Sequence, residues 1–232
     1  MKKQIISICG AHSGCGKTFI AELLLRRLQG SWAAIKYTRT AFYTTVKEST
    51  ASDDIEGKDT WRMKQAGAEP VLWVQAPEDQ IQEPLEIALS MLSEVEGVII
   101  EGNSVIEFLN PDVVIFVFGE DDKRIKESAR KILPRADIVI KRTPDNFINN
   151  EKVINIILPD GEERLINRIE VLLKTDKKKK LIERIHSLSK DGRIPCPLAR
   201  RLAEEEGISY KEIGDILNEL KIKITNCELG CF

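Results

Sequence analysis

Short runs of consecutive apolar residues alternate, over residues 1–175, with longer segments in which apolar side chains recur with helical spacing. Such short runs are typical of strands buried on both faces of a parallel sheet. The sequence predicts strands at residues 5–9, 32–36, 71–74, 97–101, 112–118, 137–140 and 153–157. It predicts helices at residues 19–28, 60–66, 84–92, 123–133 and 162–173. We therefore predict an α/β domain over residues 1–175, with a mostly parallel sheet covered by helices on both faces.

The pattern changes after residue 175. A run of four lysines at residues 177–180 is predicted to be either a linker or the solvated start of a helix. Beyond it, the apolar spacing predicts helices at residues 181–188, 197–206 and 209–220, followed by a short strand at 222–224. Ser209 and Glu212 form a capping-box pattern at the start of the last helix. We predict a small helical domain over residues 176–232, whose last two helices resemble a helix-turn-helix.

The junction between the first predicted strand and the first predicted helix reads Gly-Ala-His-Ser-Gly-Cys-Gly-Lys-Thr at residues 10–18. Glycines let backbone N–H groups surround an anion, and a helix N-terminus adds the positive end of its dipole. Strand, glycine-rich turn, Gly-Lys-Thr and helix in this order are typical of the phosphate-binding loop of P-loop NTPases. The expected nucleotide contacts are Ser13, Gly14, Cys15, Gly16, Lys17 and Thr18. Lys17 is expected on the β- and γ-phosphates and the Thr18 hydroxyl on Mg²⁺, although Ala11 stands where the usual motif has glycine.

Two acidic residues and one lysine are the next candidates for the site. Glu101 ends a buried predicted strand, and Asp59 opens a helix directly after a long polar segment at residues 37–58. Each has an ordinary alternative, Glu101 as a surface residue at a strand end and Asp59 as a helix N-cap. As functional residues they would be Mg²⁺ ligands and would place the attacking water. Lys36 is expected to contact phosphate, and residues 37–58 are predicted to be a loop that responds to the nucleotide.

Charge and hydropathy narrow the function classes. The chain has 35 basic and 37 acidic side chains, for a formal net charge of −2. This balance gives no general electrostatic attraction to nucleic acid or to a membrane surface. No apolar segment reaches membrane-spanning length, and the chain opens on a predicted strand instead of a signal peptide. We therefore expect a cytoplasmic protein.

Several motifs occur along the chain in a fixed order. They are the loop at 10–18, Ile-Lys-Tyr-Thr at 35–38, Gly-Lys-Asp-Thr at 57–60, Lys-Gln-Ala-Gly-Ala at 64–68 and Ile-Glu-Gly at 100–102. This set, which covers about two thirds of the chain, resembles the MobB family of P-loop GTPases associated with molybdopterin guanine dinucleotide synthesis. The resemblance implies an often dimeric GTP-binding accessory protein with weak hydrolysis. Its expected partners are the nucleotidyltransferase that attaches GMP to molybdopterin or molybdoenzyme apoproteins.

The resemblance also implies roles for particular residues. Lys17 and Thr18 would carry phosphate and Mg²⁺, and Asp59 and Glu101 would lie at the metal and water side. The identity of the bound base is less well defined. Many GTPases recognise guanine through an Asn-Lys-x-Asp motif after a late strand. Here the strand at 137–140 is followed by Lys-Arg-Thr-Pro-Asp. The sequence therefore leaves the choice between GTP and ATP open.

Three of the five cysteines lie in the C-terminal region, at Cys196, Cys227 and Cys231. Thiolates gathered in space suit Zn²⁺ or an iron–sulfur cluster, with His186 or an outside group as a fourth ligand. The alternatives are ordinary buried thiols or a redox pair. If the cysteines hold metal, the chain is instead a nucleotide-gated metallochaperone or cluster-insertion factor.

The predicted helix-turn-helix raises a third possibility, a nucleotide-regulated DNA-binding protein. Its last helix carries Lys211 as its single basic residue, against Glu212, Asp215 and Glu219. A recognition helix needs positive charge to meet the phosphates of a duplex. Nucleic-acid binding is therefore the least favoured of the three functions.

Overall fold

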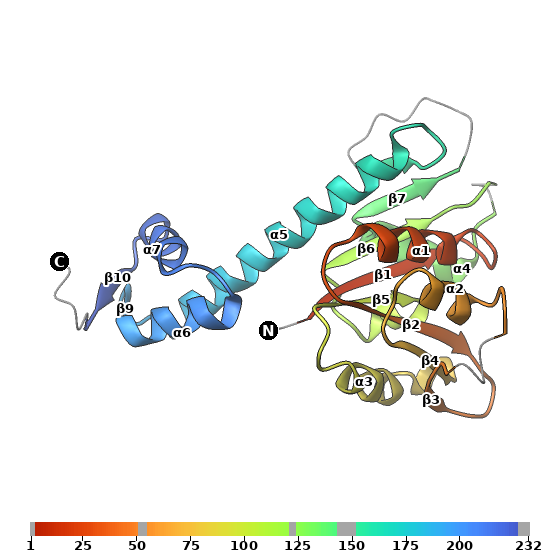
Figure 1. Cartoon of the computed structure of the whole chain (residues 1–232), viewed down its shortest axis with the longest axis horizontal. Helices are drawn as coiled ribbons and strands as arrows, with labels where there is room; N and C mark the ends of the chain where they lie inside the picture. The colour runs from red at the N-terminus through yellow and green to blue at the C-terminus, as the bar shows by residue number, and fades with distance from the viewer. Residues whose placement is uncertain (1–2, 51–54, 121–123, 143–151, 227–232) are drawn as a thin grey trace. The chain divides into compact units, whose positions relative to one another are not determined.

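The computed structural model describes residues 3–50, 55–120, 124–142 and 152–226, and the chain divides between Leu173 and Lys174 into two compact units. In the larger unit, the described residues form an eight-stranded sheet in the order β3-β4-β2-β5-β1-β6-β7-β8 (Figure 1). Its strands are β1 (Gln4–Gly10), β2 (Trp32–Arg39), β3 (Thr45–Glu48), β4 (Val71–Ala76), β5 (Gly97–Glu101), β6 (Val113–Val117), β7 (Ile138–Lys141) and β8 (Val153–Asn155). All neighbours pair in parallel except β3 and β4, so the predicted mostly parallel sheet is confirmed.

Helices cover both faces of this sheet. They are α1 (Lys17–Arg27), α2 (Asp59–Gln65), α3 (Gln82–Met91), α4 (Glu127–Ile132) and α5 (Gly161–Leu188). The short 3-10 helices are η1 (Glu78–Gln80), η2 (Ser104–Glu107) and η3 (Leu133–Arg135). Buried side chains of α1, α2 and the first part of α5 share one core with the sheet, while α3 and α4 pack on the opposite face.

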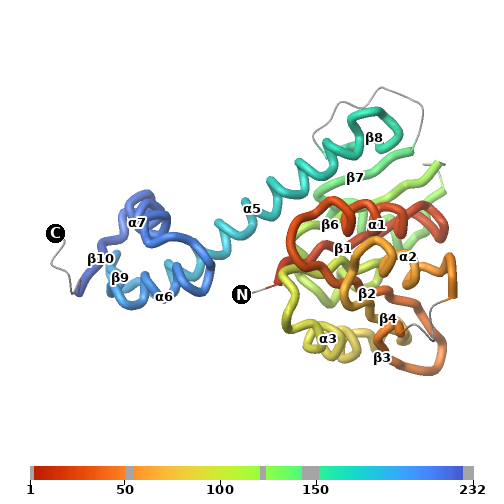
Figure 2. The backbone as a smooth tube through the Cα atoms, viewed as in Figure 1, coloured from red at the N-terminus to blue at the C-terminus, as the bar shows by residue number. Residues whose placement is uncertain are grey.

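Strand alternation explains how the two cores arise. Ile6 and Ile8 of β1 belong to the core under α1, whereas Cys9 belongs to the core on the opposite face. In β5, Ile99 points to the first face, and Val98 and Ile100 point to the other. Both faces of the central strands are therefore buried, as their continuous apolar sequences predict. Figure 2 shows the chain passing from β1, inside the sheet, directly into α1.

The segment 37–58 is not the unbroken loop that its polar composition predicts. β2 continues to Arg39, and residues 45–48 form β3, which pairs antiparallel with β4. Gln75 of β4 supports this edge, because its side chain donates to the Tyr43 hydroxyl at 2.8 Å and accepts from Thr45 at 3.2 Å. β3 has one partly buried apolar residue, Val46, so its hydrophobic signal is too weak to read from sequence.

The lysine run at 177–180 neither breaks nor starts a helix, so both sequence interpretations are wrong. These residues lie inside α5, which continues without interruption from Gly161 to Leu188. Lysine has good helix propensity, and Lys180 forms an ion pair of 2.6 Å with Asp176 one turn earlier. The helix predicted from residue 123 also begins later than expected, because α4 starts at Glu127.

The smaller unit contains the end of α5, β9 (Arg193–Pro195), α6 (Cys196–Glu206), α7 (Tyr210–Glu219) and β10 (Lys223–Thr225). β9, which was not predicted, pairs in parallel with β10. The predicted capping box is confirmed, because the Ser209 side chain accepts from Glu212 N–H while the Glu212 carboxylate accepts from Ser209 N–H. A separate apolar core, which includes Ile185, Leu202 and Leu217, holds the unit together. Among the described residues, no helix has the length and apolar character needed to cross a bilayer.

Candidate functional site

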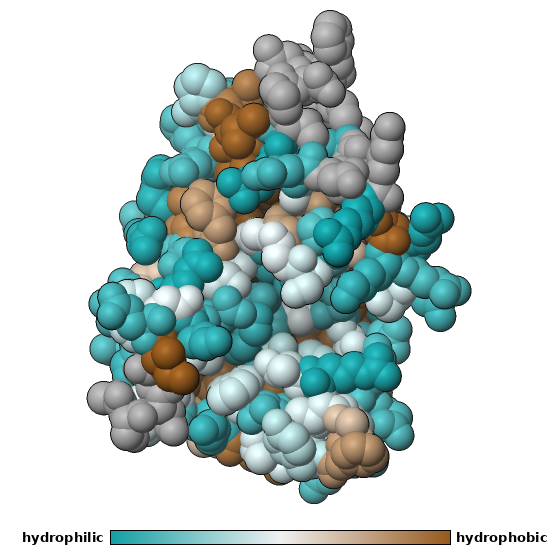
Figure 3. All heavy atoms as spheres, turned by 90° about the vertical axis from the view of Figure 1, so that its right-hand side faces the viewer, coloured by the Kyte–Doolittle hydropathy of each residue, from teal (hydrophilic) through white to brown (hydrophobic). Residues whose placement is uncertain are grey.

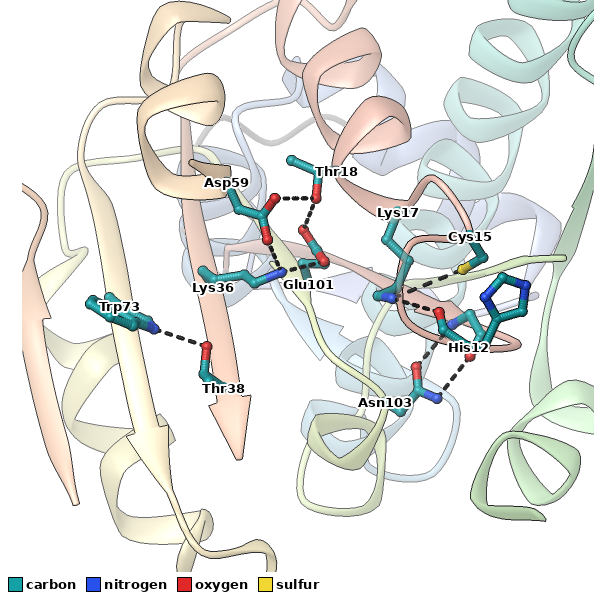
Figure 4. A network of polar contacts seen from close by, with 11 residues as sticks. His12, Cys15, Lys17, Thr18, Lys36, Thr38, Asp59, Trp73, Glu101 and Asn103 are labelled. Carbon is teal, nitrogen blue, oxygen red and sulfur yellow. Dashed lines mark hydrogen bonds and ion pairs between the residues drawn. The ribbon is translucent and has the colours of Figure 1, made fainter. Parts of the chain in front are cut away.

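The glycine-rich loop joins β1, in the middle of the sheet, to the N-terminus of α1 (Figure 4). Gly14 and Gly16 adopt left-handed conformations, with φ of 78° and 99°, and Gly16 is the N-cap of α1. Gly10 is needed for space, because a Cβ at this position would lie 2.3 Å from Cys15 Sγ. Cys15 is one of the expected nucleotide contacts, but its side chain is buried in the core. Only its backbone can therefore face a ligand.

Asn103 fastens the start of this loop. Its side-chain amide accepts from Gly10 N–H and donates to Gly10 O, each at 2.9 Å. Asn103 follows β5, which lies next to β1, so its side chain needs only to cross to the neighbouring strand. Sequence reasoning missed this residue. The available signal was its place two residues after Glu101, at the same sheet edge as the loop.

Lys17 folds back over the loop. Its ammonium donates to His12 O at 3.3 Å and lies 3.9 Å from Cys15 Sγ. Within the described part of the chain, Lys17 has no carboxylate partner. A phosphate-loop lysine held by a backbone carbonyl in this way has unused donor capacity for an anion.

Two carboxylates converge on Thr18. Its hydroxyl lies 3.0 Å from Asp59 Oδ1 and 2.9 Å from Glu101 Oε2, and Glu101 is only 2% exposed. Glu101 ends β5, beside β1, and Asp59 is the first residue of α2, which packs against α1. The structure therefore brings together the three residues that were expected to lie near Mg²⁺.

Lys36 joins the same cluster from β2. In the register of β2 and β5 it lies directly opposite Glu101, and its ammonium is 2.5 Å from both Glu101 Oε1 and Asp59 Oδ2. Burial lowers the pKa of Lys36, but the charges and hydrogen bonds of the two carboxylates outweigh burial, and the net pKa is raised. Burial likewise acts to raise the pKa of Asp59, but bonding to Lys36 and Thr18 prevails and lowers that pKa.

The composition of this cluster fits Mg²⁺. Mg²⁺ prefers hard oxygen ligands and is commonly bound through one or two carboxylates together with phosphate oxygens and water. The Thr18 hydroxyl, Asp59 and Glu101 supply such oxygens beside the phosphate loop. Figure 3 shows the side of the molecule toward which β2 runs, where hydrophilic and intermediate residues surround separate hydrophobic patches.

The proposed cysteine site is not assembled in the part of the chain that the structure describes. Cys196 begins α6 and is partly buried, while Cys227 and Cys231 lie outside the described residues. Among the described residues, no group of three or more His, Cys, Asp or Glu side chains is placed to hold a metal ion. Metal binding through these cysteines stays a prediction. Cys9, inside β1, is an ordinary buried thiol whose pKa burial raises to about 11.

A glycine-rich loop between a central parallel strand and a helix, with acidic side chains at the end of the next strand, defines the P-loop class of α/β proteins. The model of the MobB family, described as molybdopterin guanine dinucleotide synthesis protein B, matches residues 5–133. The chain belongs to this family, and membership implies a role in molybdopterin guanine dinucleotide synthesis. The smaller unit lies beyond the matched region.

A crystal structure of the "apo" form of LpxK from Aquifex aeolicus in complex with ATP is similar, with a TM-score of 0.45 and 17% sequence identity. The similarity covers 66% of this chain and 53% of that one, so this chain spans about half the length of LpxK. No curated protein matches the sequence.

Proposed function

We propose that this chain binds GTP with Mg²⁺ at its phosphate loop and serves molybdopterin guanine dinucleotide synthesis as a nucleotide-dependent accessory protein. The observation that carries the proposal is the position of the Thr18 hydroxyl, within 3.0 Å of both Asp59 and Glu101. A hydroxyl and two carboxylates supply the oxygen ligands that Mg²⁺ prefers. The Gly-Lys-Thr segment that opens α1 supplies the N–H groups and the lysine that bind phosphate.

Each residue has a distinct part in this proposal. The N–H groups of residues 13–18 surround the phosphates, and Lys17 exchanges its contact with His12 O for phosphate oxygens. Thr18, Asp59 and Glu101 would hold Mg²⁺, which neutralises charge on the β- and γ-phosphates when bound. Lys36 holds the two carboxylates side by side and orients them toward Thr18.

The same cluster supports slow hydrolysis. A general base must be free to accept a proton from the attacking water. Both carboxylates near the loop are instead engaged by the Lys36 ammonium at 2.5 Å. Asp59, whose pKa is lowered, is a weak base. These contacts favour a protein that holds its nucleotide over one that turns it over rapidly.

Guanine preference, a homodimer and the partner are proposed from what the family resemblance implies. For a protein that serves the synthesis of a guanine dinucleotide, we expect a response to a guanine nucleotide. On this proposal the partner is the nucleotidyltransferase that attaches GMP to molybdopterin, or a molybdoenzyme apoprotein that receives the product. The homodimer that the family resemblance implies belongs to the same proposal.

Competition between GTP and ATP tests the nucleotide. A fluorescent GTP analogue bound in Mg²⁺ would be displaced by each nucleotide in turn, with Thr18→Ala as the variant that lacks the metal-side hydroxyl. The proposal expects GTP to displace the probe at lower concentration than ATP, and Thr18→Ala to lose the Mg²⁺ dependence of binding. Equal displacement by ATP would contradict the guanine preference, and unchanged Mg²⁺ dependence would contradict the metal site.

A further inference from the structure

Arg142 lies against the phosphate loop from the side opposite the carboxylates. It directly follows β7, which pairs with β6, and β6 pairs with β1. Its guanidinium carbon is 5.5 Å from the centroid of the Phe19 ring on α1. Its Nη1 is 3.4 Å from the place that a Cβ on Gly16 would occupy. The guanidinium therefore covers the first turn of α1, directly beside Gly-Lys-Thr.

The charge of Arg142 is not neutralised by the described residues. Among them it makes no hydrogen bond or ion pair, and its guanidinium lies over the Phe19 ring in a cation–π contact. The N-terminal end of α1 and the Lys17 ammonium are also positive and lie on the same loop. Gathering two cations at the positive end of a helix is unfavourable unless an anion binds between them.

The contrast with Lys36 shows which cations are reserved for a ligand. Lys36 is paired with Glu101 and Asp59, on the β5 and β2 side of β1. That side is the end of the site where Mg²⁺ and the terminal phosphate belong in the proposed function. A nucleotide that begins there and follows the loop must run toward β6 and β7, where Arg142 lies. The part of the ligand next to Arg142 is then the phosphate nearest the nucleoside.

We propose that Arg142 binds the α-phosphate of the nucleotide. This inference rests on the proposed function, because it requires a nucleotide in the loop. The planar guanidinium presents a fork of N–H donors that matches two phosphate oxygens, and its cation–π contact with Phe19 keeps it beside the first turn of α1 before the ligand arrives. Arg142 thereby contributes to the affinity for mono-, di- and triphosphates alike.

Calorimetric titration of GTP, GDP, GMP and guanosine into wild type and Arg142→Ala tests the assignment. We expect the variant to weaken all three phosphorylated ligands by a similar factor, about 10-fold or more, and to leave guanosine unchanged. Arg142→Lys keeps the positive charge but loses the fork of N–H donors, so its affinity for the phosphorylated ligands should lie between those of wild type and Arg142→Ala. Arg26→Ala, at the far end of α1, is the matched control and should bind like wild type.

The possible results distinguish failure of this inference from failure of the proposed function. If Arg142→Ala binds every ligand as wild type does, the inference fails while the proposed function stands. If only the affinity for GTP falls, Arg142 belongs to the terminal phosphate. If the affinity for guanosine falls by the same factor, Arg142 belongs to the base. Either result would overturn the inference. If wild type binds no nucleotide, the proposed function fails and the inference falls with it. Circular dichroism of the variant shows that it folds.

Discussion

Lys36 and Glu101 face each other across β2 and β5, with the lysine ammonium 2.5 Å from a carboxylate oxygen that is almost completely buried. The parallel register determines this contact, because it places both residues at the same level of the sheet, where β1 enters the phosphate loop. Asp59 completes the ion pair from α2. The cluster ties three elements to the loop before any ligand is present.

Replacing Lys36 by methionine should destabilise the protein. The change removes the ammonium that contacts both carboxylates, so that Arg62 is left as a weaker electrostatic partner while Glu101 stays almost completely buried. Breaking such a pair from one side should lower the free energy of unfolding by about 3 kcal/mol. Denaturant unfolding at neutral pH measures the loss. Lys131→Met, on the exposed side of α4, is the control, and an equal loss in both variants would contradict the account.

Asp59 should contribute to stability in a pH-dependent way. Its pKa in the folded protein is lowered from the ordinary 3.8, so the folded state favours the ionised form. The contribution is fully present above pH 3.8 and is lost as the pH falls through the lowered pKa. The difference in unfolding free energy between wild type and Asp59→Asn should therefore shrink on acidification below pH 4. A difference that stays constant down to pH 2 would contradict the lowered pKa.

Asn103 should matter both to stability and to nucleotide affinity. Asn103→Ala removes two hydrogen bonds to the Gly10 peptide and should cost about 1–2 kcal/mol of unfolding free energy. It should also weaken GTP binding, because the loop loses an anchor at its first residue. Asn103→Asp retains an acceptor for Gly10 N–H, so its free energy of unfolding should lie between those of wild type and the alanine variant. Alanine and aspartate variants of equal stability would argue against the two-bond contact.

Gly10 and Cys15 should show energetic coupling. A methyl group on Gly10 would lie 2.3 Å from Cys15 Sγ, so Gly10→Ala should destabilise the loop by about 1–3 kcal/mol. Removing the sulfur with Cys15→Ala should relieve part of this cost in the double variant. The remainder reflects Lys17, whose Cγ would be 3.0 Å from the same methyl group. Additive effects of the two changes in a double-mutant cycle would contradict the close approach.

The sequence carries clear signals for the parts of the fold that are strongly apolar or locally capped. The central strands, the glycine-rich turn and the Ser209–Glu212 capping box all belong to this group. β3 escapes prediction because an edge strand stabilised by pairing to β4 needs few apolar residues. The unbroken α5 escapes because a run of lysines resembles a linker, while its support comes from the Lys180–Asp176 ion pair and from the Lys177 ammonium, which donates to the backbone carbonyl of Glu206.

The site likewise contains residues that the sequence predicts and residues that it does not. Thr18, Asp59 and Glu101 were expected near one another from the motifs, and strand order and helix packing bring them into contact. Asn103 and Arg142 have no local motif. Asn103 reaches the loop from the end of the adjacent strand β5, and Arg142 reaches α1 from the end of β7, two strands from β1. Such contacts depend on tertiary register, which single-sequence patterns do not contain.

The most direct test of the account is a calorimetric titration of GTP in Mg²⁺ into wild type and Lys17→Ala. The phosphate loop predicts saturable binding to wild type and an affinity lower by about 100-fold or more in the variant, because its main phosphate-binding cation is gone. Binding of equal strength by Lys17→Ala, or no binding by the folded wild-type protein, would contradict nucleotide binding at this loop.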